Sequence, residues 1–138
     1  MSRRVAREIA FKALFQHDIG KNELEPALSE LLAESGVSGE TAAFARKLAE
    51  GTLANLNEID QTMSGYLQNW QIERLAAVDR NVLRLAGYEL LYLEDIPAAV
   101  SINEALELSK AFNSEESAKF LNGVLDKLAR DRKDSEVE

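Results

Sequence analysis

The sequence predicts an all-α protein, because apolar residues recur at helical spacing along most of its length and no stretch alternates like a strand. Its 138 residues fit a single domain. Only seven glycines and two prolines interrupt the chain, and 46% of its residues are hydrophobic. This composition is that of a folded globular protein, and we expect about seven helices.

The N-terminal half, about residues 1–69, contains four predicted helices. Proline suits the first turn of a helix, so Pro26 marks the start of the second helix, and Gly36 suits its end. Ser38 is a suitable N-cap for the third. The expected ranges are 3–18, 26–34, 38–55 and 57–68.

The C-terminal half, about residues 70–130, begins with a predicted helical turn at 73–76. The next helix, about 79–93, takes Asp79 as its cap and is apolar on most of its circumference, so it should be central and contacted from several sides. After Pro97, the pattern Ser101-x-x-Glu104 is a capping box that predicts the start of the sixth helix.

Ser114 is the predicted cap of the last helix, which leads into a charged tail at 131–138 expected to fray. Gly123 lies inside this helix, where glycine costs about 1 kcal/mol relative to alanine. A close approach of another helix would explain it.

Composition excludes several classes of function. The chain has no cysteine, which excludes disulfides, thiol catalysis and cysteine-bound zinc and fits a reducing cytoplasm. Charged residues interrupt the first 20 positions and no run of 18 apolar residues occurs, so we expect neither a signal peptide nor a membrane span. His17 is the only histidine, and neither glycine-rich phosphate loops nor metal-ligand spacings occur. We therefore expect no enzyme, no metal and no cofactor.

Charge is distributed unevenly along the chain. The net charge of −8 argues against general affinity for nucleic acids, yet residues 1–17 carry four basic side chains and one acidic, a net +3. On a helical wheel Arg4, Arg7, Phe11 and Phe15 fall within about 80° of one another. Guanidinium groups interleaved with rings suit RNA, and the alternative is a solvated basic end whose phenylalanines pack in the core.

Two further places carry residues of interest. Lys119 and Phe120 lie at the edge of the last helix's apolar stripe, where Phe120 either stacks on a base or joins the core. Asp79, Arg80 and Arg84 open the central helix. They either present one charged end to a protein partner or pair with nearby acids.

The chain resembles the NusB family along nearly its whole length. The matched motifs are R-x-x-A-R at 3–7, W-x-x-x-R-L-x-x-V-D-R-x-V-L-R-L-A-x-Y-E-L at 70–90, D-I-P at 95–97, I-N-E-A-L-E-L at 102–108 and K-F-L-N-G-V-L-D at 119–126. The resemblance implies two small helical bundles packed together. It also implies binding to the boxA element of nascent ribosomal transcripts, with the ribosomal protein NusE as partner, in an antitermination complex on RNA polymerase.

The resemblance also implies which residues carry this function. Asp79 occupies the acidic position that faces NusE, beside Arg80 and Arg84. The residues at the family's RNA-proximal positions are Arg3, Arg4, Arg7, Phe15, Phe112, Lys119 and Phe120, with Glu116 at an acidic position that tunes complex formation. We expect that replacing Arg4 and Arg7 by alanine weakens RNA binding and changes stability no more than a surface substitution.

Two alternatives to this function stay open. The first is a helical interaction module without RNA binding, and the second is a stand-alone relative of the NusB-like RNA-binding domain of ribosomal-RNA cytosine methyltransferases. The oligomeric state also stays open, because some family members form homodimers that hide the RNA face. RNA affinity that falls steeply with salt would separate RNA binding from an apolar protein interface.

Overall fold

The structure is a computed structural model that describes residues 2–68 and 71–137, with side chains as far as Arg132. Trp70, the start of the longest matched motif, lies outside the described residues. Within them the expected all-α fold is confirmed, with seven α-helices, one 3-10 helix and no strand. The elements are α1 Arg3–Gly20, α2 Leu24–Ser35, α3 Gly39–Ala54, α4 Leu56–Ser64, η1 Ile72–Arg74, α5 Ala77–Tyr92, α6 Ala98–Phe112 and α7 Glu115–Val137.

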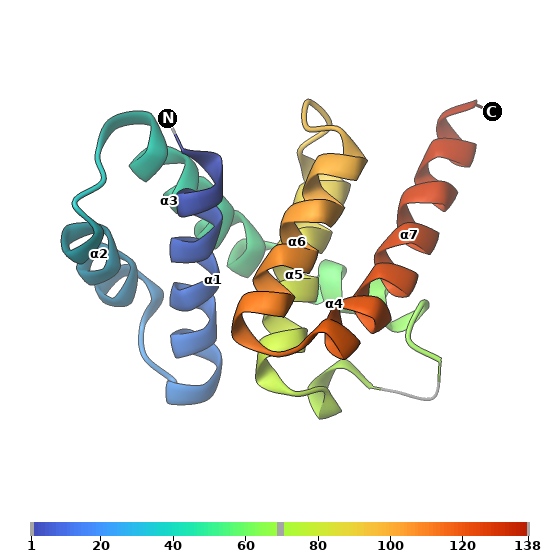
Figure 1. The fold of residues 1–138 in the computed structure, drawn as a ribbon, viewed down its shortest axis with the longest axis horizontal. Coiled ribbons are helices and arrows are strands. Elements are labelled where there is room, and N and C mark those ends of the chain that lie inside the picture. The colour runs from blue at the N-terminus through green and yellow to red at the C-terminus, as the bar shows by residue number, and fades with distance from the viewer. Residues whose placement is uncertain (1, 69–70, 138) are drawn as a thin grey trace.

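The helices follow one another across the molecule, with α1, α2 and α3 at one side, α5 and α6 in the middle and α7 at the other side (Figure 1). α1 packs on α2 and α3, while α5 packs on α4, α6 and α7. α1 and α3 also pack on α5, so a continuous hydrophobic core extends from Ala6 in α1 to Leu128 in α7.

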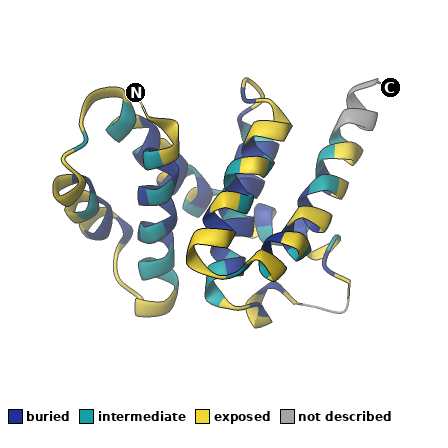
Figure 2. Cartoon of the chain, in the orientation of Figure 1, coloured by how far each residue is buried: buried dark blue, intermediate teal, exposed yellow. Residues whose placement is uncertain are grey.

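α5 is the central helix, as its nearly continuous apolar circumference predicted. It contacts five other helices, and all its residues carry the buried or intermediate colours of Figure 2. Three polar side chains are buried with its apolar ones, namely Asp79, Asn81 and Glu89. Buried polar groups need internal partners, and these three find theirs on other helices, which places charged contacts inside the fold.

Three predicted helix starts are wrong, and the first is that of α2, which begins at Leu24, two residues before Pro26. α6 begins at Ala98 directly after Pro97, so Ser101 lies one turn inside the helix instead of capping it. Ser101 is buried and donates to Glu89, and Glu104 binds Arg4. α5 begins at Ala77, and Asp79 lies in its first turn, where the helix dipole favours a carboxylate. The predicted cap at Ser114 is confirmed, since its hydroxyl accepts from the Ser117 amide.

Close helix packing occurs at glycines other than Gly123. A Cβ atom on Gly51 would meet the Tyr88 ring at 2.2 Å, and one on Gly87 would meet Met63 at 2.7 Å. At Gly123 nothing lies within 4 Å of that position, so the expected close approach there is wrong. Gly36 ends α2 with a φ of 67°, as predicted.

α7 is longer than expected and continues past Asp131 to Val137. The Tyr66 hydroxyl donates to the Asp131 carboxylate at 2.6 Å, which ties this part of α7 to the segment after α4. None of the described helices combines the length and the low polarity needed to cross a bilayer.

Candidate nucleic-acid interface

The three arginines at the start of α1 have different partners and different exposure. Arg4 is 66% exposed and donates to Glu104 of α6 through Nε at 3.0 Å and Nη2 at 3.1 Å. The Arg3 guanidinium lies over the ring of Phe44 in α3, 4.6 Å from its centroid. Consecutive helical residues are about 100° apart, so Arg3 and Arg4 contact different helices. Arg3 and Arg7 are four residues apart and share one face, and the Arg7 guanidinium lies 5.6 Å from the centroid of the same Phe44 ring.

Arg7 is an internal residue. It is 3% exposed, and its Nε and Nη2 donate to the two carboxylate oxygens of Glu89 in α5 at 2.9 and 2.8 Å. Ser101 of α6 donates to the same carboxylate at 2.8 Å. This contact joins α1, α5 and α6. Arg7 is therefore not part of the expected cationic surface, because it is buried, whereas Arg3 and Arg4 are exposed and Arg4 is paired with an acid there.

Acidic side chains surround the exposed arginine. The hydrogen bond and the charge of Glu104 raise the pKa of Arg4 above its already high ordinary value. Glu8 and Glu107 line the same shallow hollow of about 180 Å³ between α1 and α6. A phosphate that approaches Arg4 would meet three carboxylates, so this end of the surface is a poor site for RNA in the free protein.

An aromatic groove lies further along the same two helices. Its hollow of about 310 Å³ is lined by Phe11, Lys12, Phe15, Gln16, Val78 and Phe112. Phe112 is 37% exposed at the end of α6, and its ring centroid lies 5.1 Å from that of Phe11. The Phe15 ring follows at 6.0 Å from Phe11. Two predicted RNA-binding residues, Phe15 and Phe112, therefore meet in one place.

Lys12 is the residue that sequence reasoning missed. Its Nζ atom lies 5.7 Å from the centroid of the Phe112 ring, and a looser contact of 3.6 Å joins it to Glu8. The signal was present in the sequence, because Lys12 and Phe15 are three residues apart and so are neighbours on the surface of a helix. The groove thus combines an accessible ring, a second ring and a cation.

The remaining predicted residues of the last helix gather at a third hollow, the Asp79 hollow. It measures about 290 Å³ and lies where α5 and α7 begin, with Glu116 and Phe120 in its lining and Phe120 partly exposed. Lys119 is exposed beside them. Asn113, next to Phe112, donates to Asp79 at 3.1 Å, so the Asp79 hollow adjoins the aromatic groove. Burial raises the pKa of Asp79, and hydrogen bonds from Asn113 and Ser117 offset only part of that rise.

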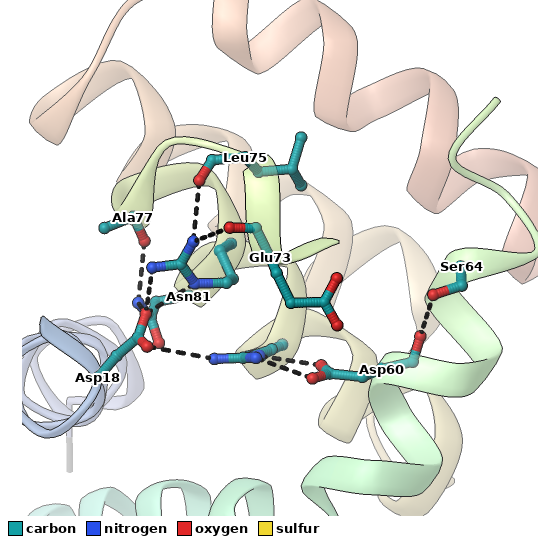
Figure 3. A network of polar contacts seen from close by, with 9 residues as sticks. Asp18, Asp60, Ser64, Glu73, Leu75, Ala77 and Asn81 are labelled. Atoms are coloured by element: carbon teal, nitrogen blue, oxygen red, sulfur yellow. Dashed lines mark hydrogen bonds and ion pairs between the residues drawn. The ribbon is translucent and has the colours of Figure 1, made fainter. Parts of the chain in front are cut away.

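Arg80 and Arg84 pair with internal acids, and the prediction that they present charge to a partner is wrong. Arg80 donates to Asp18 at 2.7 Å, and Arg84 makes two bonds to Asp60 at 2.9 and 2.8 Å. Figure 3 shows Asp18 and Asp60 within this network. The nearby acids come from α1 and α4, which the sequence of α5 alone did not reveal.

The same network controls the acidity of Asp18. Burial alone would raise the pKa of Asp18, but hydrogen bonds from Arg80 and Asn81 and the charges of Arg80 and Arg84 outweigh it, so the pKa lies below its usual value. His17 contacts the backbone oxygen of Asn22 through Nδ1 at 2.7 Å, a local structural role. Among the residues that the structure describes, no group of His, Cys, Asp or Glu side chains is arranged to hold a metal ion.

Comparisons with known proteins identify the family and the fold of the chain. A model of the NusB family matches residues 4–130. The chain is 48% identical over 134 residues to the transcription antitermination protein NusB of Desulforamulus reducens, which covers 97% of this chain and 93% of that protein. The solved structure of T. maritima NusB matches with a TM-score of 0.88 at 46% identity, over 94% of this chain and 92% of that one.

A further solved structure contains the antitermination factors NusB and NusE in complex with dsRNA. It matches with a TM-score of 0.86 at 29% identity, over 93% of this chain and 96% of that one. The relatives are named for a role in transcription and not for a reaction, which agrees with the expectation that the chain is no enzyme. The family match, the full-length relatives and the shared fold lead to one conclusion: this chain belongs to the NusB family of transcription antitermination proteins.

Proposed function

We propose that the chain binds RNA at the aromatic groove, with Phe112, Phe15 and Lys12 as its principal contacts. The observation that carries this proposal is the exposed Phe112 ring beside the Lys12 ammonium group. Aromatic faces stack on unpaired bases, at about 1–3 kcal/mol per base, and a neighbouring cation binds the adjoining phosphate. A solved NusB in complex with NusE and dsRNA supports RNA as the ligand.

The RNA is boxA of nascent ribosomal transcripts, as the resemblance to the family implies, and the complex forms on RNA polymerase in the bacterial cytoplasm. NusE binds at the neighbouring Asp79 hollow, where a largely buried carboxylate lies beside the partly exposed Phe120. Lys119 and Glu116 flank the boundary between the two sites and contact both partners. Arg7, Arg80 and Arg84 are structural residues in this proposal, and Arg3 contributes only long-range charge.

The acids near Arg4 predict that the chain alone binds boxA weakly. Only Lys12 offers charge at the aromatic groove, while Glu8, Glu104 and Glu107 oppose a strand that extends toward Arg4. A complex with NusE presents more surface to the RNA and should bind it more tightly. Equal titration curves with and without NusE would contradict this part of the proposal.

The test is a titration of boxA RNA against a scrambled control, with and without NusE, at several salt concentrations. We expect Lys12→Ala to weaken binding and to reduce the slope of log affinity against log salt by about 0.7, the loss of one contact to a single-stranded phosphate. Phe112→Ala should weaken binding without a change in that slope. Lys47→Ala is the matched control, because Lys47 is exposed on α3, away from both sites.

An interaction module without RNA binding would give a different result. Its partner affinity would hardly respond to salt, and boxA and scrambled RNA would bind equally poorly. If Lys12→Ala and Lys47→Ala weaken boxA binding to the same small extent, the aromatic groove is not the RNA site.

A further inference from the structure

A fourth hollow, the Pro97 groove, lies at the opposite end of α6 from Phe112. α6 runs from Ala98 to Phe112, so the groove and the aromatic groove are about 20 Å apart along the helix axis. The Pro97 groove measures about 380 Å³ and lies between the α5–α6 connection and the far part of α7. Figure 1 shows α7 diverging from α6 toward this end.

The floor of the Pro97 groove is apolar. Leu90 and Leu93 from the end of α5, Ile96 from the connection and Ala129 from α7 line it. The residues 97–100 beside it are all apolar and all exposed, and the Val100 side chain is 43% exposed. Exposed apolar side chains that adjoin an apolar hollow are typical of an interaction site, whereas single exposed ones are ordinary.

The two walls of the Pro97 groove carry opposite charges. On α7, Arg132 donates to the backbone oxygen of Leu91 at 3.4 Å, and it has no ion-pair partner among the described side chains. Its neighbour Arg130 is already paired with Asp126. The exposed Glu94 lies on the opposite wall. Among the described residues, only the Leu91 carbonyl occupies a donor of the five that Arg132 carries at the edge of this apolar surface.

We propose that the Pro97 groove docks a segment of another protein that places an aliphatic side chain on the floor and a carboxylate on Arg132. The guanidinium group binds a carboxylate through two parallel hydrogen bonds, and Glu94 sets the direction of the segment by repelling a second acid on its side. RNA fits this surface poorly, because no aromatic ring lines it and Glu94 repels phosphates. The distance from the aromatic groove allows both ligands to bind at once.

The test is a selection of random twelve-residue peptides displayed on phage against the full chain, followed by titration of the enriched peptides as synthetic molecules. We expect enriched peptides to carry Asp or Glu near Leu, Ile or Val. Arg132→Glu should weaken their binding about tenfold or more, because it reverses the charge that pairs with the acid. Lys127→Glu is the matched control, since it makes the same charge change at another exposed position of α7.

Two further measurements locate the site. Peptide binding should shift the methyl resonances of Leu90, Leu93 and Ile96, and Arg132→Glu should leave the thermal midpoint and boxA affinity unchanged. The proposal is overturned if no peptide is enriched, if the enriched peptides bind Arg132→Glu as tightly as wild type, or if Lys127→Glu weakens them equally. It is also overturned if the shifts centre on Phe112.

Discussion

Two ion pairs that α1 makes with the C-terminal helices have the same geometry but different surroundings. Arg4 binds Glu104 and Arg7 binds Glu89, each through Nε and Nη2 to both carboxylate oxygens. The arginines are three residues apart on the same helix. The Arg4 pair lies at the surface, whereas the Arg7 pair is enclosed and receives a third hydrogen bond from Ser101.

The difference shows that burial decides whether an arginine can bind a ligand or serves only to stabilise the fold. Because the Arg7 pair is buried, water cannot replace a lost partner. Both side chains therefore stay in place, and the contact joins three helices. The Arg4 pair exchanges with solvent, so its partner can be displaced by another anion. A ligand can therefore bind Arg4 by displacing Glu104, whereas a ligand cannot reach the buried Arg7.

The largest expected effect is on stability. Arg7→Ala should lower the free energy of unfolding by about 3–5 kcal/mol, because it leaves the Glu89 carboxylate buried without its partner. Urea denaturation followed by circular dichroism measures the loss. Arg4→Ala is the control and should leave the unfolding midpoint close to that of wild type. Equal midpoints for the two variants would show that the buried pair does not stabilise the fold as described.

A smaller effect should appear in the pH dependence of stability, where Asp18 and Asp79 act in opposite directions. The pKa of Asp18 is lowered in the fold, so its contribution is present above the ordinary aspartate pKa of 3.8 and is lost as pH falls below it. The pKa of Asp79 is raised, so its contribution is present below 3.8 and is lost as pH rises through the folded value.

Urea denaturation from pH 3 to pH 6 separates these two contributions. Asp18→Asn should flatten the loss of stability at the acid end of the range. Asp79→Asn should instead remove a decline in stability that occurs as pH rises above 3.8. Curves that change in the same direction for both variants would contradict the opposite environments of the two carboxylates.

The smallest expected effect concerns RNA and the exposed pair. Glu104→Gln should raise boxA affinity about threefold to fivefold, the range expected when one weak surface ion pair no longer competes with phosphate. The gain should require Arg4, so the double variant Arg4→Ala, Glu104→Gln should bind no better than Arg4→Ala. Fluorescence anisotropy at low salt measures all four proteins of this cycle.

Glu30→Gln is the matched control for the change of charge, because Glu30 is exposed on α2, away from the proposed RNA site. If it raises affinity as much as Glu104→Gln, the gain reflects net charge alone. If the gain persists without Arg4, Glu104 does not act by occupying Arg4.

Local patterns predicted the fold well because helix periodicity depends on near neighbours. The central position of α5 followed from its apolar circumference, and the cap at Ser114 from its own side chain. The pattern Ser101-x-x-Glu104 was misleading for a physical reason. Its two polar side chains bind Glu89 and Arg4 on other helices. α6 begins directly after Pro97, four residues before Ser101.

The site was predicted only in part, since it depends on contacts between residues far apart in the chain. Phe15 and Phe112 were found through the resemblance to the family, and the structure brings them together. The sequence did not predict the ion pairs of Arg7, Arg80 and Arg84, because their acidic partners are between 24 and 82 residues away in the chain. Lys12 could have been predicted from its helical spacing to Phe15, but the prediction considered only the arginines of this helix.

The most direct test of RNA binding at the aromatic groove is photo-crosslinking with boxA RNA that carries 5-iodouridine, a probe that reacts with nearby aromatic side chains. Mass spectrometry of the digested complex then locates the adducts. We expect adducts on Phe112 or Phe15, and we expect the Phe112→Ala and Phe15→Ala variants to lose them. Adducts confined to α2, α3 or the far part of α7, with none on α1 or α6, would contradict it.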